Sequence, residues 1–290
     1  MQISRNIKFV VLGVGKIGMS IVQAFAQKDF SVVGIDVNED NLKAGLEKVR
    51  ANLDYLIGKG RITPEQRERI LGNIQLSNDY AHVSDADVVI EAVFEDMELK
   101  KRIFREIDEK VRSKDALLLS NTSALSISEI ASATGRPEFV AGMHFFNPVP
   151  LMRVVEIVRG VDTSDETIQQ VVELTRLLGK EPILSKDSPA FIVNRILNAL
   201  IMEACRIVQE GVGTIEDVDK GVELGLGHPM GPFKLIDWGD GIQLVTHVCE
   251  YMADELGDRF KPPVWLKNYV RAGRTGKSSG RGFYDYVDKK

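Results

Sequence analysis

The chain has 290 residues, of which 44% are hydrophobic and 27% charged, a balance typical of globular rather than disordered proteins. Its net charge of -5 excludes the basic footprint of a nucleic-acid-binding protein. No apolar run approaches the roughly 20 residues that cross a bilayer, and residues 1–6 lack the apolar centre of a signal peptide. We expect a cytoplasmic protein that binds neither nucleic acid nor membrane. Its two cysteines, Cys205 and Cys249, are expected to be reduced and buried.

The first half of the chain alternates short apolar runs with longer helical patterns. The runs show no polar alternation, which indicates strands buried on both faces, as in a parallel sheet. Helices are expected over residues 17–27, 39–57 and 98–111, and a capping box at Thr163-x-x-Glu166 predicts another. This βαβ order is typical of a doubly wound, Rossmann-type fold. The expected strands cover residues 8–12, 31–35, 87–90, 116–119, 139–143, 154–158 and 182–184.

The pattern changes after residue 185. One long apolar helix is expected over residues 191–209, with Pro189 near its start. Thr214-x-x-Asp217 can cap the next helix, and two more are expected over residues 242–256 and after Pro263. No strand pattern occurs between residues 190 and 280. We therefore predict two domains, a Rossmann-type domain over residues 1–185 and a smaller all-α domain over residues 186–290.

A glycine-rich turn follows the first expected strand directly. In Gly13-x-Gly15-x-x-Gly18, the first glycine permits a tight turn, the second lets a pyrophosphate approach the backbone, and the third allows close packing of helix on strand. The following helix presents its N-terminal N–H groups to the phosphates. Asp36 ends the second strand, where a carboxylate can accept both ribose hydroxyls and repels a 2′-phosphate. The pattern predicts an NAD site, although a flavin could use the same glycines.

His144 follows the apolar run over residues 139–143. Ligands of such sheets bind beyond the carboxyl ends of the strands. Oxidation of an alcohol by hydride transfer needs a base there, and imidazole can accept a hydroxyl proton near neutral pH. Glu156 lies inside the apolar run over residues 154–158, where a buried carboxylate needs a partner, and His144 can be that partner. Spacing alone leaves open that both residues are structural.

Longer blocks resemble those of the 3-hydroxyacyl-CoA dehydrogenases, including the bacterial 3-hydroxybutyryl-CoA dehydrogenases. The resemblance covers nearly the whole chain, and the HFFNPVP and FIVNR blocks are highly specific to this family. The related sugar-acid dehydrogenases share the fold but not the FFNPVP block. The matching blocks are the glycine loop, EAVFE from residue 91, SNTSA from 120, HFFNPVP from 144, VEIVRG from 155, SPAFIVNR from 188, GHPMGPF from 227 and GRGFY from 280.

The resemblance implies reversible, NAD-dependent oxidation of (3S)-3-hydroxyacyl-CoA, in particular 3-hydroxybutyryl-CoA, to the 3-ketoacyl-CoA. It implies that His144 is the catalytic base and Glu156 its partner. Ser123 and Asn194 would complete the site by bonding the substrate and the nicotinamide. The resemblance also implies a homodimer, to which the apolar stretch over residues 196–207 could contribute.

Binding roles are implied at further matching positions. Lys59 matches a position that contacts CoA, and Asn52 stands where the family often has a serine near CoA. The resemblance implies no metal. The positions implied for NAD, together with those of the glycine turn, are Gly13, Gly15, Gly18, Asp36, Glu95, Lys100, Ser123 and Asn147.

Two departures from the family concern substrate fit and cofactor contact. Ala190 stands where the family usually has glycine, and Ser278 and Ser279 stand where it often has lysine and threonine. A cofactor contact from this C-terminal segment therefore stays open. Two other functions also stay open. One is a dehydrogenase of the same fold that acts on a free hydroxy acid, such as a sugar acid or carnitine. The other is a non-catalytic NAD-binding protein, which we would expect to lack the His–Glu pair.

Overall fold

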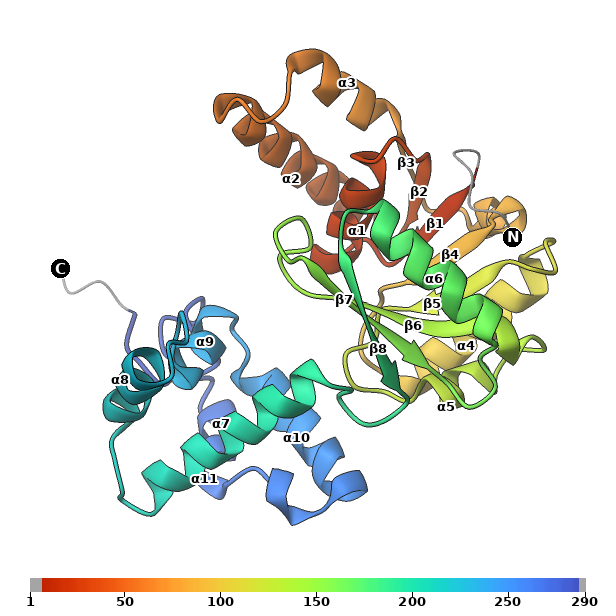
Figure 1. Ribbon diagram of the computed structural model, residues 1–290. Coiled ribbons are helices and arrows are strands. Elements are labelled where there is room, and N and C mark those ends of the chain that lie inside the picture. Colours follow the sequence, from red (N-terminus) through yellow and green to blue (C-terminus); the bar gives the residue numbers. More distant parts are fainter. Residues whose placement is uncertain (1–6, 287–290) are drawn as a thin grey trace. The chain divides into compact units, whose positions relative to one another are not determined.

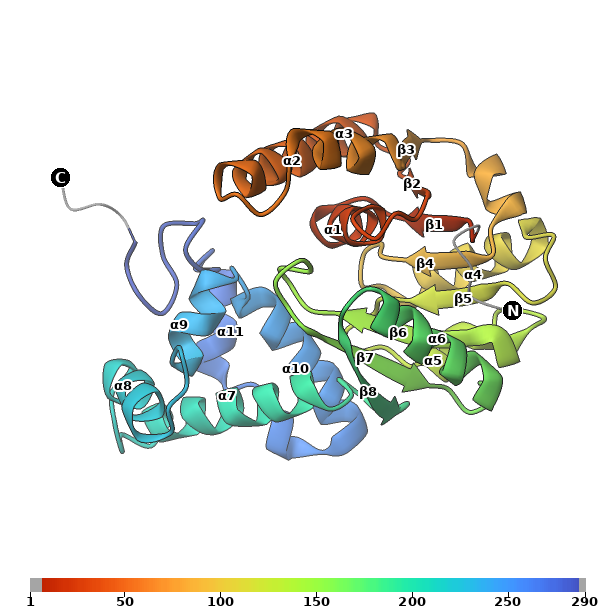
Figure 2. The ribbon, with the colours of Figure 1, turned by 45° about the horizontal axis from the view of Figure 1, so that its top comes forward.

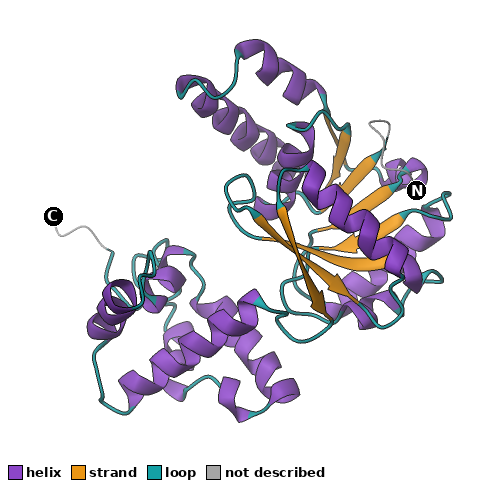
Figure 3. Ribbon diagram, viewed as in Figure 1, coloured by secondary structure: helices purple, strands orange, loops and turns teal. Residues whose placement is uncertain are grey.

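The computed structural model describes residues 7–286 (Figure 1). Its contacts divide the described chain into two units, one ending at Phe191 and the other beginning at Ile192. All the strands of the described residues belong to the first unit, and the second is built of helices with only isolated bridges (Figure 3). The predicted fold class, a Rossmann-type domain followed by a smaller helical domain, is thereby confirmed. The expected boundary near residue 185 lies at the end of β8, a few residues before this division.

The elements of the first unit follow the expected βαβ order. The strands are β1 (Phe9–Leu12), β2 (Val32–Ile35), β3 (Ile74–Ser77), β4 (Val88–Glu91), β5 (Leu117–Ser120), β6 (Val140–Phe145), β7 (Val154–Arg159) and β8 (Glu181–Lys186). The helices are α1 (Lys16–Ala26), α2 (Glu39–Gly58), α3 (Pro64–Gly72), α4 (Met97–Lys110), α5 (Ile127–Ala131) and α6 (Asp165–Leu177), with short 3-10 turns η1 (Tyr80–Asp85) and η2 (Pro137–Phe139).

These strands form one sheet, whose order within the described residues is β3-β2-β1-β4-β5-β6-β7-β8. Neighbouring strands are parallel except β6 and β7, which are antiparallel. The sequence predicted parallel strands, but an apolar run contains no information about strand direction. β3 was not predicted, because it is an edge strand whose side chains are only partly buried. The antiparallel pair is what positions the site described below.

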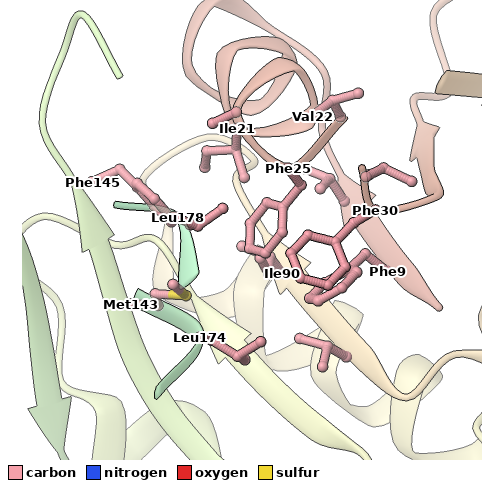
Figure 4. Packing of buried hydrophobic residues seen from close by; sticks show 14 of the residues in the cluster. Phe9, Ile21, Val22, Phe25, Phe30, Ile90, Met143, Phe145, Leu174 and Leu178 are labelled. Atoms are coloured by element: carbon pink, nitrogen blue, oxygen red, sulfur yellow. The ribbon is translucent and has the colours of Figure 1, made fainter. Parts of the chain in front are cut away.

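Each central strand is buried on both faces of the sheet. On one face, Phe9 of β1 packs on Phe25 of α1 (Figure 4), and the ring centroids are 4.4 Å apart. The cluster around this pair includes residues of α2, α3 and α6. On the other face, Val10 and Leu12 pack in a cluster with Phe104 of α4 and residues of α5. Figure 2 shows α6 lying over β6 and β7. Burial of apolar surface, at roughly 25 cal/mol per Å², is the main stabilising term of this layered arrangement.

Two helix starts differ from the predictions. The expected capping box at Thr163 is wrong, because the N-cap of α6 is Ser164, whose side chain accepts the N–H of Thr167. The Thr163 hydroxyl instead accepts the N–H of Gly160 and donates to the carbonyl of Val140, so it closes the turn after β7. The identity of a cap therefore depends on the turn that precedes the helix as well as on the residue pattern.

The long helix after Pro189 begins later than expected. Ala190 and Phe191 have φ values of 59° and 52°, in the left-handed region, so α7 starts only at Val193. Glycine adopts this conformation at no steric cost, whereas an L-residue carries a penalty of about 1–2 kcal/mol. The usual family glycine at position 190 thus has a physical reason, and Ala190 tolerates the strained conformation while wholly buried.

The second unit is built around two buried carboxylates. Asp219 accepts the N–H groups of Phe233 and Lys234 and the hydroxyl of Tyr284. Asp237 accepts the N–H groups of Phe283 and Tyr284, and burial raises its pKa. These bonds fasten the C-terminal GRGFY block to the helices. The helices are α7 (Val193–Gln209), α8 (Ile215–Gly225), α9 (Pro232–Trp238), α10 (Ile242–Leu256) and α11 (Val264–Arg271), with the 3-10 turn η3 (Asp258–Phe260).

Cys205 and Cys249 are both wholly buried in this helical unit, and burial raises the pKa of each thiol to about 12. The expected character of both cysteines, small buried apolar side chains, agrees with this environment. Among the helices of residues 7–286, none has both the length and the apolar composition needed to cross a membrane.

Candidate active site

The glycine turn between β1 and α1 is held in a conformation that only glycine fits. Gly13 has a φ of +82°, and its N–H donates to the carbonyl of Ile35 at 2.8 Å. A Cβ atom on Gly13 would lie 2.8 Å from the carbonyl oxygen of Ala92, and one on Gly18 would lie 1.8 Å from the carbonyl oxygen of Gly13. The first and third glycines therefore serve the turn and the packing of α1, as the sequence predicted.

Gly15 has a different environment. It is the N-cap of α1, it provides no side-chain cap, and the first turn of α1 contains no acidic residue. A Cβ atom on Gly15 would meet no described atom within 4 Å. The space beside Gly15 and the N-terminal N–H groups of α1 are thus available to an anion, which the helix dipole also favours. These features fit the pyrophosphate of a dinucleotide.

The carboxylate of Asp36 lies at the same turn. Its Oδ2 accepts the N–H of Val14 at 3.0 Å and its Oδ1 accepts the N–H of Asn38 at 2.9 Å. The side-chain amide of Asn41 lies 3.3 Å from both oxygens. An oriented, partly exposed carboxylate at the end of β2 fits the two hydroxyls of an NAD ribose and repels a 2′-phosphate.

His144 and Glu156 face each other across the antiparallel pair of β6 and β7. The two residues are direct partners in the register of the strands. The Nδ1 atom of His144 lies 3.0 Å from Oε2 of Glu156, with the side chains 3% and 0% exposed. The imidazole also packs on the ring of Phe146, with centroids 4.4 Å apart. With Nδ1 engaged by a carboxylate, Nε2 is the ring nitrogen that can exchange a proton.

The SNTSA block after β5 forms a turn in which polar side chains hold the backbone. Asn121 accepts the N–H of Phe145, the residue after His144, at 2.8 Å. Glu95 accepts the hydroxyl of Thr122 at 2.6 Å and the N–H of Ser123 at 2.8 Å. Glu95 and Ser123, both predicted site residues, are therefore brought together. Asn121 and Thr122 were not among the predicted site residues, although both lie within the SNTSA block.

The remaining residues expected at the cofactor differ in exposure. Asn147 is exposed on the turn between β6 and β7, where its peptide bond to Pro148 is cis. Lys180 holds this turn, because its ammonium group donates to the carbonyls of Val149 and Met152 at 2.5 and 2.6 Å, and burial lowers its pKa. Lys100, by contrast, is 1% exposed, with its ammonium group 2.6 Å from the carboxylate of Glu91.

The residues expected at the substrate lie on two helices of different units. Asn52 and Lys59 are exposed on α2 and at its C-cap, two turns apart and therefore on one face of the helix. Asn194 lies in the first turn of α7 in the second unit, where it is half-buried. The N–H of Ser278 donates to Asp240 within that second unit.

Alcohol oxidation by hydride transfer requires a hydride acceptor and a base, and a dinucleotide turn with a histidine oriented by a buried carboxylate can supply both. The turn fits the cofactor, the carboxylate at the end of β2 favours NAD, and the imidazole can take the hydroxyl proton. The fold and the site together define a Rossmann-type, NAD-dependent dehydrogenase.

Comparison with known proteins identifies the family within this class of dehydrogenases. The sequence matches the NAD-binding domain of 3-hydroxyacyl-CoA dehydrogenase over residues 8–188 and its C-terminal domain over residues 191–286. It is 40% identical to the Bacillus subtilis probable 3-hydroxybutyryl-CoA dehydrogenase, across 97% of this chain and 98% of that protein. It is 36% identical to the mitochondrial hydroxyacyl-coenzyme A dehydrogenase of Sus scrofa, across 95% and 90%. The crystal structure of (S)-3-hydroxybutyryl-CoA dehydrogenase from Ralstonia eutropha gives a TM-score of 0.92 at 38% identity, with 97% and 99% covered.

The chain therefore belongs to the 3-hydroxyacyl-CoA dehydrogenase family, whose members are NAD-dependent oxidoreductases. The resemblance seen in the sequence blocks is confirmed over nearly the full length. NAD is the cofactor of its first domain, and the flavin alternative falls away.

Alanine substitutions in the glycine turn should separate folding from cofactor binding. Gly15→Ala meets no described atom, so we expect an unchanged melting temperature for the cofactor-free protein but an NADH dissociation constant raised at least about tenfold. Gly18→Ala should instead lower the melting temperature, because its Cβ would overlap the carbonyl of Gly13. Thermal melting and fluorescence titration with NADH measure both effects. Unchanged NADH binding by Gly15→Ala would place the pyrophosphate elsewhere.

Proposed function

We propose that this enzyme oxidises (3S)-3-hydroxyacyl-CoA, in particular 3-hydroxybutyryl-CoA, to the 3-ketoacyl-CoA, with His144 as general base. The observation that carries the proposal is the buried contact of 3.0 Å between Nδ1 of His144 and Glu156. The Bacillus subtilis and Ralstonia eutropha relatives named for 3-hydroxybutyryl-CoA support the choice of substrate. The His–Glu pair also disfavours a non-catalytic NAD-binding protein, because a binding protein has no need of an oriented base.

In the forward direction, Nε2 of His144 accepts the proton of the 3-hydroxyl group as the C3–H bond breaks. Glu156 accepts the Nδ1–H hydrogen bond, fixes the tautomer, and stabilises the imidazolium that forms. NAD, when bound, supplies the electrophilic ring that accepts the hydride. In the reverse direction, the imidazolium returns its proton to the ketone oxygen. A positioned general base of this kind contributes about 10²–10⁴-fold to the rate.

The polar residues around the base take supporting roles. Ser123 hydrogen-bonds the substrate and the nicotinamide from the turn that Glu95 holds by its backbone N–H groups. Asn147 contacts the cofactor from its exposed turn, and Asn194 contributes an amide from the start of α7 to the substrate. Burial of a polar reacting group needs such partners, because unpaired polar atoms are costly once water is excluded.

The CoA portion of the substrate is assigned to α2. Lys59 and Asn52 lie on one face of this helix, and both are exposed. The ammonium group of Lys59 lies 5.5 Å from the ring centre of Tyr55, which is also exposed. A flexible cation is suited to a phosphate group of CoA. A CoA ester would use this face of α2, whereas a free hydroxy acid has no CoA portion to place there.

A turnover assay decides between these substrates. The purified enzyme should oxidise NADH with acetoacetyl-CoA as acceptor and should be far less active with NADPH, because Asp36 repels a 2′-phosphate. Free 3-keto acids and 3-dehydrocarnitine serve as the competing acceptors. A higher kcat/KM for a free acid than for the CoA ester would refute the proposed substrate. A series of longer 3-ketoacyl-CoA esters measures the preferred chain length.

Substitutions of the catalytic pair test the mechanism. His144→Gln should bind NADH nearly as the wild type does and lose turnover by about 10²–10⁴-fold, because the general base is gone. Glu156→Gln should lose less, since the imidazole remains. His247→Gln, on the exposed face of α10, is the matched control and should keep full activity. Substantial turnover by His144→Gln would remove this residue from the base role.

We further propose that the enzyme is a homodimer joined through its helical domain. Ile201, Met202, Ala204 and Cys205 of the apolar stretch over residues 196–207 are buried in the core of that unit, but Ile196 is 67% exposed. Several other large apolar side chains of this unit are also exposed, and such a group favours contact with a partner surface. Sedimentation should give twice the 32.2 kDa mass of one chain, and a single-chain mass would contradict the dimer. The other large apolar side chains exposed on this unit include Leu224, Leu226, Trp238, Leu244 and Val264.

A further inference from the structure

A second group of buried charges lies at the carboxyl ends of β4 and β5. Glu91 is the last residue of β4 and is 0% exposed. Its Oε1 accepts from the ammonium group of Lys100 at 2.6 Å and from the N–H of Val93 at 2.8 Å. Its Oε2 accepts from the hydroxyl of Ser120 at 2.7 Å. Both oxygens of this carboxylate are therefore bonded within the protein.

Lys100 links this carboxylate to a second one. Its ammonium group also lies 3.4 Å from Oε2 of Glu95, while Oε1 of Glu95 accepts the N–H groups of Ser123 and Ala124 at 2.8 and 3.1 Å. One ammonium group thus lies between an inner carboxylate that solvent does not reach and an outer carboxylate that holds the Ser123 turn. An unbroken series of short polar contacts connects β4, α4 and this turn.

Buried ionic groups are an inefficient source of stability, because the loss of hydration offsets much of their attraction. A fully bonded network does fix the orientation of its members. The location of this network is consistent with such a role. Glu91 and Ser120 are register partners at the carboxyl ends of two central strands, and ligands of this fold bind beyond such strand ends. Glu91 also fixes the backbone of Val93, whose side chain lies 2.8 Å from the position a Cβ on Gly13 would occupy.

We propose that Glu91 is a positioning residue of the cofactor site, which acts through Lys100 on Glu95 and the Ser123 turn. Lys100 then affects NAD binding through Glu95, because its own ammonium group is enclosed by the two carboxylates. The inference rests on the proposed function, in which Ser123 contacts the nicotinamide.

Three variants separate positioning from a structural role. Glu91→Gln leaves the Lys100 ammonium group paired with Glu95 alone, so it should destabilise the protein. The double variant Glu91→Gln/Lys100→Met removes both buried charges and should regain most of the melting temperature. It does not restore the partner of Glu95. Lys101→Met is the control, because Lys101 pairs with Glu98 and Glu129 at the surface of α4.

The cofactor-free protein gives the first measurement. In the double variant, hydrogen exchange of the Ser123 and Ala124 amides should accelerate at least about tenfold, the expected result of weakening a hydrogen bond to a charged group. The NADH dissociation constant, measured by fluorescence, should rise by about the same factor, and kcat should fall while the KM for acetoacetyl-CoA stays near the wild-type value. Lys101→Met should match the wild type in each measurement.

A double variant with wild-type amide exchange and wild-type NADH affinity would overturn the inference. If the double variant does not fold, Ser120→Ala decides in its place, because it removes one hydrogen bond of Glu91 together with the acceptor of the Thr122 N–H. We expect it to weaken NADH binding about threefold, and an unchanged affinity would again overturn the inference. Failure of the proposed function is distinguishable, because the wild-type enzyme would then fail with acetoacetyl-CoA whatever the variants do.

Discussion

The antiparallel pairing of β6 with β7 is the constraint on which the catalytic site depends. In an antiparallel pair, residues in register have Cβ atoms about 4.5–5.5 Å apart, close enough for their side chains to bond. His144 and Glu156 are in register in this pair. A crossover connection would instead make β7 run parallel to β6 and would change this register. The single reversal of direction in an otherwise parallel sheet therefore gives the imidazole its carboxylate partner.

The sequence predicted the parts of this arrangement but not the direction of the strand. Apolar runs identified β6 and β7, and a carboxylate inside an apolar run indicated a buried partner for Glu156. The residues between the two strands contain the turn that reverses the chain, and Lys180 holds this turn from the loop between α6 and β8. That contact joins residues far apart in the sequence, so no local pattern reports it. β3 was not predicted, because partial burial at the edge of the sheet weakens the apolar signal in its sequence.

The SNTSA block shows a further limit of sequence reasoning. The block was recognisable as a unit, and Ser123 was assigned a role at the reacting groups. Its other polar residues hold the backbone: Ser120 bonds Glu91, Asn121 bonds the N–H of Phe145, and Thr122 bonds Glu95. Each partner lies on a neighbouring strand or on the loop that follows it. Only the order of strands in the sheet brings these residues together, and that order is a property of the fold.

The buried carboxylates of Glu156 and Glu91 have partners of different chemistry. Glu156 pairs with an imidazole, a group that can serve as a general base, whereas Glu91 pairs with the ammonium group of a lysine. The first pair can therefore change its charge as a proton arrives and leaves. The second pair instead holds the turn beside it, because Lys100 also contacts Glu95, which accepts the N–H of Ser123. A site that moves one proton needs both an oriented base and a preorganised turn around the reacting groups, and the two pairs divide these tasks between them.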